Sequence, residues 1–219
     1  MERKYAWHNY DDATMEKVYA LSDTYRQFLD NGKTERECVV QAVEFAEAKG
    51  YVNLNDIIKS NTSIKAGDKI YYTHMDKSIA LFNIGTDDIE LGMNILGAHI
   101  DSPRIDVKQN PQYENSNLVF WDTHYYGGIK KYHWVAMPLA IHGVVVKTDG
   151  TRININIGDK ESDPVFCITD LLPHLGQEQM QKNAAKVIEG EALDLLIGSR
   201  PVKDEEKEAI KDEKEYQVG

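Results

Sequence analysis

The sequence predicts an α/β fold, and three features of its 219 residues support this class. Two segments between residues 14 and 49 repeat apolar side chains every three or four positions, which is the period of an amphipathic helix. From residue 69 onward the chain changes to short β-type runs separated by turn residues. Residues 93–100, MNILGAHI, are almost wholly apolar, as expected of a strand that helices cover on both faces.

The two predicted helices have recognisable ends. The first ends at Asn31-Gly32, and the second is predicted to start at Thr34, because Glu37 three residues later completes a capping box. Gly50 is expected to end the second helix, since glycine readily adopts the conformation that follows a helix. The apolar face of the first helix comprises Met15, Val18, Leu21, Tyr25 and Phe28.

The predicted strands begin with two runs, KIYYTHM and SIALFNI, which Asp76-Lys77 joins as a hairpin. RIDVKQ, a little further along, is predicted to be another strand. Residues 134–158 are predicted to form successive strands, with Asp149-Gly150 as a tight hairpin turn. The second half of the chain is therefore expected to be rich in antiparallel β structure.

The charge and composition exclude several classes of partner. A formal net charge of −11 and a pI near 5.1 disfavour nucleic acids and anionic membranes, because phosphate binding requires a surplus of Lys and Arg. The opening residues, MERKYAWHNYDD, contain no apolar stretch, so no secretory signal is predicted. Cys38 and Cys167 are too far apart in sequence for a CxxC motif, which favours a reducing compartment. We expect a soluble, cytoplasmic protein.

Two of the seven histidines begin an H-x-D pattern, at residues 74–76 and 99–101. Residues i and i+2 of a strand point to the same side, so the carboxylate can reach the imidazole. A metal-bound histidine needs such an acceptor on its second nitrogen. His74 falls at the predicted turn, where Asp-Lys is ordinary turn chemistry. His99 ends the apolar run, where open α/β sheets place ligand sites, although a pattern this short also fits an ordinary surface histidine.

The segment ILGAHIDSPRIDVK resembles the histidine-aspartate strand of the aspartyl aminopeptidase and vacuolar aminopeptidase I family of zinc peptidases. The likeness extends over YYTHMDKSIALFNIG and WDTHYYGGIKKYHWVAMPLAIHGVVV, and ITDLLPHLGQ is similar to a proline-histidine-leucine element of that family. The resemblance implies an α/β peptidase domain with an inserted β-rich dimerisation domain. Residues 1–108 would belong to the peptidase domain, residues 109–200 to part of the dimerisation domain, and residues 201–219 to a charged tail.

The same resemblance implies a zinc-dependent aminopeptidase that removes N-terminal amino acids from peptides, with two zinc ions in each complete site. His99 would be a metal ligand, and Asp101 would take part in catalysis by holding the other ring nitrogen of that histidine. His174 would contact the bound substrate from a neighbouring subunit. Self-association to dimers, and from dimers to a dodecamer, is implied as well.

The chain departs from the family in one respect. A zinc pair needs about five ligands and a glutamate that acts as general base, and in the family most of these lie beyond the dimerisation domain. No such motif occurs here, because Glu205-Glu206 stands in a charged context. We therefore expect a fragment that is inactive alone. Two alternatives stay open: a non-catalytic oligomerisation module, and another co-catalytic zinc peptidase of the same broad fold.

Overall fold

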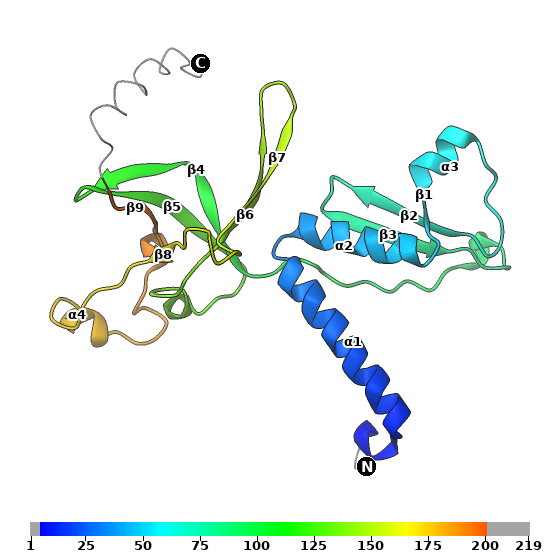
Figure 1. Cartoon of the computed structure of the whole chain (residues 1–219), viewed down its shortest axis with the longest axis horizontal. Helices are drawn as coiled ribbons and strands as arrows, with labels where there is room; N and C mark the ends of the chain where they lie inside the picture. Colours follow the sequence, from blue (N-terminus) through cyan, green and yellow to red (C-terminus); the bar gives the residue numbers. More distant parts are fainter. Residues whose placement is uncertain (1–4, 201–219) are drawn as a thin grey trace. The chain divides into compact units, whose positions relative to one another are not determined.

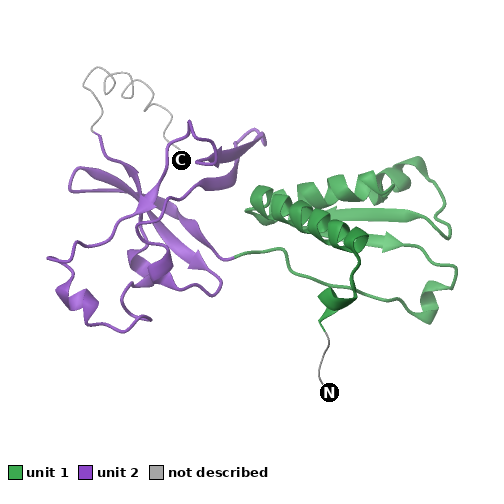
Figure 2. Cartoon of the chain, turned by 60° about the horizontal axis from the view of Figure 1, so that its bottom comes forward, with its two compact units in different colours: residues 1–102 green, residues 103–219 purple. Residues whose placement is uncertain are grey.

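The computed structural model describes residues 5–200, and the chain divides into two compact units between Ser102 and Pro103 (Figure 2). Helices and sheets are both present, which confirms the predicted α/β class. Residue 108, which the family resemblance makes the last residue of the peptidase domain, lies inside strand β4 (Arg104–Asn115) of the second unit. The predicted charged tail, residues 201–219, lies outside the described residues.

Unit 1 contains helices and one small sheet (Figure 1). The sheet has the order β1-β2-β3, with β1 parallel to β2 and β2 antiparallel to β3. None of the helices in the described part of the chain combines the length and apolar character that a membrane crossing requires. The elements are α1 (Asp12–Asn31), α2 (Glu35–Ala48), β1 (Val52–Asn53), α3 (Leu54–Ser60), β2 (Lys69–His74) and β3 (Ser78–Asn83), with 3-10 turns at Ala6–Asn9 and Ile89–Leu91.

The predicted local signals are confirmed in unit 1. The Thr34 hydroxyl accepts the Glu37 N–H at 3.3 Å, and the Glu37 carboxylate accepts the Thr34 N–H at 2.9 Å, so the capping box is complete. The β2–β3 hairpin turns through Met75 and Asp76, which have φ values of 51° and 56°. At α1, the Asp11 carboxylate accepts the Thr14 N–H at 2.8 Å, and hydrogen bonding from the Thr14 side chain, with a further contribution from this N–H, lowers the pKa of Asp11.

The core of unit 1 lies between α2 and the sheet, while α1 remains largely exposed. Tyr71 is buried, and its hydroxyl donates a 2.7 Å hydrogen bond to the Glu47 carboxylate at the end of α2. The apolar face predicted for α1 forms on a helix as expected, yet Leu21 and Tyr25 are 72% and 59% exposed. The other buried side chains of this core are Cys38, Val39, Ala46 and Ile70.

The strand predicted at residues 93–100 is wrong for this structure. The segment is irregular and exposed, and Leu96 is 100% accessible to solvent. A strand buried on both faces needs neighbours that pair with its backbone and helices that cover its side chains. Within residues 5–200 none of the three sheets includes a strand that pairs with this segment. The apolar sequence suits a buried strand, and the described residues provide neither the pairing strands nor the covering helices for one.

Unit 2 is mainly β structure. Its four-stranded sheet has the order β4-β5-β9-β8 with every neighbouring pair antiparallel, and β6 and β7 form a separate hairpin. The elements that follow β4 are β5 (Leu118–Tyr126), β6 (Ile141–Val146), β7 (Arg152–Ile157), β8 (Cys167–Ile168), α4 (Gln177–Met180) and β9 (Leu195–Gly198), with 3-10 turns at Lys131–His133 and Gly190–Ala192.

The core of unit 2 is centred on the segment that leads into β9. Leu193 is fully buried and packs with Ile168, Ile188 and Leu195. The buried Thr123 hydroxyl of β5 donates a hydrogen bond to the Leu193 carbonyl, so the polar atom within this core is satisfied. The sheet and the segment before β9 are therefore joined by both apolar packing and a buried hydrogen bond.

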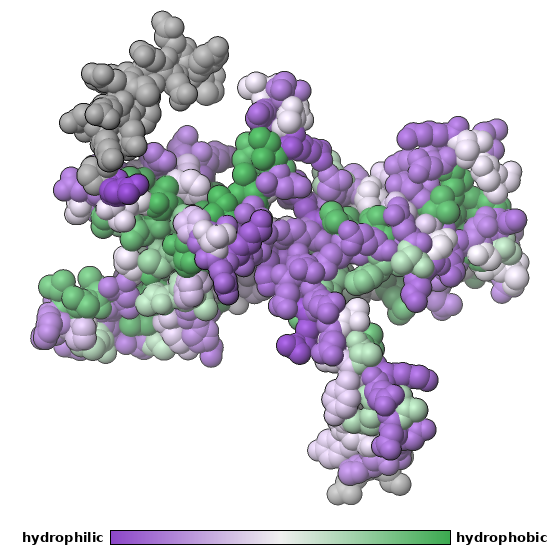
Figure 3. Space-filling model, in the orientation of Figure 1, coloured by the Kyte–Doolittle hydropathy of each residue, from purple (hydrophilic) through white to green (hydrophobic). Residues whose placement is uncertain are grey.

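The β6–β7 hairpin carries apolar side chains on one face. Its turn confirms the predicted Asp149-Gly150 signal, with Gly150 at a φ of 85° that favours glycine. Figure 3 shows a hydrophobic surface on this hairpin, and on the apolar face Val145 and Ile153 are 50% and 38% exposed. Alternation along paired strands places one set of opposite residues on the same face: Ile141 with Ile157, Gly143 with Ile155, and Val145 with Ile153.

We expect Thr34→Ala to lower the free energy of unfolding of unit 1 by about 1 kcal/mol, because it removes the acceptor of the Glu37 N–H at the start of α2. Urea unfolding followed by far-ultraviolet circular dichroism measures the change. The matched control is Thr24→Ala, which removes a hydroxyl bonded to the Ala20 carbonyl on exposed α1 and should change stability by less than about 0.5 kcal/mol. Equal losses for both variants would contradict the role of the cap.

Candidate active site

His99 and Asp101 form a local hydrogen-bonded pair at the end of unit 1. The Nδ1 atom of His99 lies 3.1 Å from the Asp101 carboxylate oxygen and 3.0 Å from the Asp101 carbonyl. Two acceptors on Nδ1 keep the proton there, which leaves Nε2 with the lone pair that a metal ion would take. The His99 side chain is 84% exposed, so this nitrogen is accessible. The contact expected from the i, i+2 spacing is present, although the segment is irregular rather than a strand.

A residue of α2 contacts Ile100, which lies between His99 and Asp101. The buried Cys38 thiol lies 3.9 Å from the Ile100 carbonyl and 3.6 Å from the Gly32 carbonyl. Burial raises the pKa of Cys38, so the thiol stays protonated and can donate weakly to either carbonyl. The irregular segment is thus attached to the helical part of unit 1 directly beside the histidine.

The donor set of the structure fits one metal-ligand position and not a whole metal site. No group of three or more His, Cys, Asp or Glu side chains within residues 5–200 is arranged to hold a metal ion. His99 is suited to one position because its second nitrogen is already held. The second H-x-D pattern does not match this geometry, because the residues after His74 form the predicted hairpin turn.

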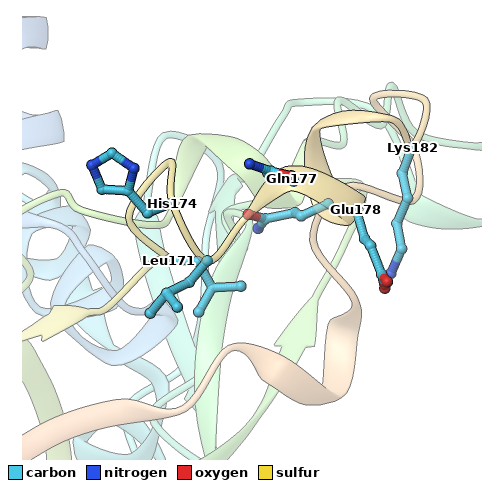
Figure 4. A pocket seen from close by; sticks show the side chains of 7 residues that line it. Leu171, His174, Gln177, Glu178 and Lys182 are labelled. Atoms are coloured by element: carbon cyan, nitrogen blue, oxygen red, sulfur yellow. The ribbon is translucent and has the colours of Figure 1, made fainter.

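His174 lies in unit 2, on an exposed turn between β8 and α4. The N–H groups of Leu175 and Gly176 both donate to the Leu172 carbonyl at 2.9 Å, which closes the chain around the histidine. The turn borders a shallow depression of about 410 Å³, and Figure 4 shows the imidazole at one end, projecting away from Glu178 and Lys182. An exposed imidazole on a closed turn is available to a molecule outside unit 2.

Sequence reasoning missed the side chains that hold this turn. One oxygen of the Asp170 carboxylate accepts the Leu171 N–H at 2.8 Å and the side-chain amide of Gln179 at 2.9 Å. The signal available in the sequence was an aspartate at the start of a loop, where it commonly bonds the backbone just after it. In β6, the Nε2 atom of His142 lies 3.1 Å from the Asp159 carboxylate.

Ionic contacts brace the segment that leads to β9. Lys108 of β4 lies 2.8 Å from both the Asp122 and Glu191 carboxylates, and these hydrogen bonds raise the pKa of Lys108. Tyr113 donates a 2.6 Å hydrogen bond to Asp194, and desolvation together with that bond raises the pKa of Tyr113 to about 12. Both cross-links are structural, since they join β4 to the segment before β9, which contributes to the core.

Comparison with known proteins gives a consistent result. A profile of the aminopeptidase I zinc metalloprotease family, M18, matches residues 28–218. A protein of Clostridium acetobutylicum described as a probable M18 family aminopeptidase 1 is 53% identical over 211 residues, which are 96% of this chain and 45% of that protein. The chain thus spans about half the length of the curated relatives it matches.

Solved structures share the fold over nearly the whole chain. An M18 family aminopeptidase from Thermotoga maritima has a TM-score of 0.84 at 44% identity, covering 95% of this chain and 44% of its own. Aminopeptidase I from Clostridium acetobutylicum has a TM-score of 0.80 at 49% identity, covering 99% and 49%. The S. cerevisiae mApe1 dodecamer shares the fold at a TM-score of 0.57 and 18% identity, covering 85% and 40%.

We expect the 219-residue chain to retain no stoichiometric zinc after dialysis, because a stable site usually takes about three or more protein ligands and no such group is gathered within the described residues. Metal analysis of the purified chain measures this, with His99→Ala beside it as the reference. Zinc held at one equivalent by the unaltered chain and lost in His99→Ala would show that further ligands lie within the 219 residues.

Proposed function

This chain belongs to the M18 family of aminopeptidase I zinc metalloproteases, and we propose that the full-length protein removes N-terminal amino acids from peptides with a pair of zinc ions. The α/β fold of the chain is that of solved family members. The 219 residues supply the first part of the peptidase fold and a β-rich unit suited to self-association. The remaining ligands and the general base would come from the other half of the length that the relatives have.

The observation that carries this proposal is the His99–Asp101 pair. It presents one imidazole with its Nδ1 held at 3.1 Å and its Nε2 exposed, which is the arrangement of a zinc-bound histidine. A zinc pair, when bound, supplies a water of lowered pKa and polarises the scissile carbonyl. Asp101 would fix the tautomer and orientation of His99 and make the imidazole a stronger ligand. Neither residue would contact the peptide itself.

His174 would act on the substrate from a neighbouring subunit. Its imidazole would donate a hydrogen bond to the charge that develops on the carbonyl oxygen of the peptide bond under attack. Removing one such donor typically costs roughly a hundredfold to a thousandfold in kcat. Support for this role comes from its exposed position on a closed turn and from its place in the segment LLPHLG. A hydrogen-bond donor exposed on the surface of unit 2 suits a site that two chains complete.

We extend the proposal to the assembly and the location of the protein. We propose dimers that join further into a dodecamer, as in the assembly of S. cerevisiae mApe1. Among the described residues the β6–β7 hairpin pairs with no further strand, and this open sheet and the β-rich composition of unit 2 support self-association through this unit. Both cysteines are free, which suits the reducing cytoplasm.

In the full-length protein, we expect His99→Ala to remove or severely weaken one zinc and abolish turnover. Asp101→Asn should keep much of the metal yet lose roughly 10–100-fold in activity, since it weakens the acceptor that orients the imidazole. Zinc analysis and hydrolysis of amino-acyl p-nitroanilides measure both effects. The 219-residue chain, free of host peptidases, should show no turnover in the same assay.

The second H-x-D pattern provides the matched control. His74→Ala and Asp76→Asn repeat the two substitutions at a hairpin turn, and asparagine tolerates the positive φ of residue 76. These variants should keep their zinc and their rate. Normal zinc and rates in both His99→Ala and Asp101→Asn would refute the assignment. A full-length protein that assembles without zinc or turnover would instead be an oligomerisation module.

We expect His174→Ala to depress kcat strongly while zinc content stays intact, because it removes a contact made in the transition state and no metal ligand. Mixing this variant with His99→Ala should restore part of the activity, since some mixed dimers contain one site with both residues. Rates are measured after subunit exchange has been verified. A mixture of His99→Ala with Asp101→Asn is the control and should recover nothing, because each site takes both residues from one chain. No recovery with His174→Ala would place that residue in its own subunit's site or outside it.

A further inference from the structure

The turn that carries His174 is closed by one carboxylate and one amide. Asp170 precedes the turn and Gln179 follows it within α4, and the two side chains meet at 2.9 Å. The same Asp170 oxygen also accepts the Leu171 N–H at 2.8 Å. The two ends of the turn are therefore fastened to a single atom, while the histidine projects from the middle (Figure 4).

The space beside Gly176 is filled by neighbouring atoms of the turn and of α4. Gly176 is buried, and a Cβ atom added there would lie 3.1 Å from the Gln179 side-chain oxygen and 3.4 Å from the Leu172 carbonyl. Contacts this short require a neighbour to move, and the Leu172 carbonyl already accepts two N–H groups at 2.9 Å. The Gln179 amide is then the group that must give way. Gly176 is thus the residue that permits the side chain of Gln179 to reach Asp170.

We propose that Asp170 and Gln179 are positioning residues for His174, an inference that rests on the proposed contact of His174 with substrate. An exposed imidazole gains no fixed direction from packing, so its direction is set by the backbone that carries it. A misplacement of about 1 Å in a catalytic contact can cost roughly a hundredfold in rate. The Asp170–Gln179 hydrogen bond holds that backbone before the partner subunit or the peptide arrives.

The hydrogen bond between Asp170 and Gln179 can be tested by exchanging the carboxylate and the amide of the two side chains. Gln179→Glu places a second carboxylate against Asp170 and replaces the hydrogen bond with repulsion. Asp170→Asn added to that variant restores a donor and an acceptor with their roles reversed, and the new amide oxygen can still accept the Leu171 N–H. Gln181→Glu adds the same charge to the same loop on an exposed side chain and serves as the matched control.

In the full-length enzyme, we expect Gln179→Glu to lower kcat by roughly 10–100-fold, with KM, zinc content and assembly unchanged. The double variant Asp170→Asn/Gln179→Glu should recover most of the lost kcat, and Gln181→Glu should keep the original value. Gly176→Ala, which displaces the Gln179 amide without changing any charge, should lower kcat in the same way. Steady-state kinetics on an amino-acyl p-nitroanilide, metal analysis and size-exclusion chromatography measure these effects.

The outcomes separate this inference from the proposed function. If His174→Ala is slow while Gln179→Glu and Gly176→Ala keep full kcat, the positioning role is overturned and the role of His174 stands. If His174→Ala itself keeps full kcat, both are overturned. The double variant has the original net charge, so a loss in Gln179→Glu that it does not recover assigns the effect to the carboxylate at position 179 itself rather than to the lost bond, and this also overturns the positioning role.

Discussion

The backbone pairing that runs from β5 through β9 to β8 determines where His174 can lie. β9 pairs with β5 through Phe120 and Leu196, and the same leucine pairs with Cys167 of β8. The Thr123 hydroxyl adds a buried hydrogen bond to the segment before β9. Because β8 ends two residues before Asp170, the sheet delivers the chain directly to the turn. The position of an exposed loop residue thus follows from strand pairing in the core.

Features that depend on neighbours in sequence could be predicted, whereas those that depend on distant partners could not. The capping box of Thr34 and Glu37 and the turn at Asp149-Gly150 involve residues within a few positions, so the sequence contains both partners. The apolar run at residues 93–100 indicates a strand only if other strands stand beside it, and within the described residues none does. The hydrophobicity of a segment indicates that it suits a buried strand, but the strands and helices that would bury it must come from elsewhere in the structure.

The same distinction applies to the candidate site. The contact between His99 and Asp101 could be predicted because the two residues are two positions apart. The bond between Asp170 and Gln179 could not, since neither residue type in a polar loop indicates a partner nine positions away. His174 has no distinguishing pattern in periodicity or charge, so only its resemblance to the family pointed to it. Residues that position others are the hardest to find from one sequence, because ordinary polar side chains serve this purpose.

The β6–β7 hairpin also affects how the protein behaves at high concentration. Among the described residues β6 and β7 pair only with each other, so each strand has an outward edge of N–H and C=O groups that another chain can join. Its valines and isoleucines have the composition of segments that stack between molecules. The net charge of −11 keeps such edges apart at neutral pH, and this repulsion fades as the pH approaches 5.1. Acidification and added salt therefore favour precipitation by edge-to-edge stacking, while storage at neutral pH and low ionic strength opposes it.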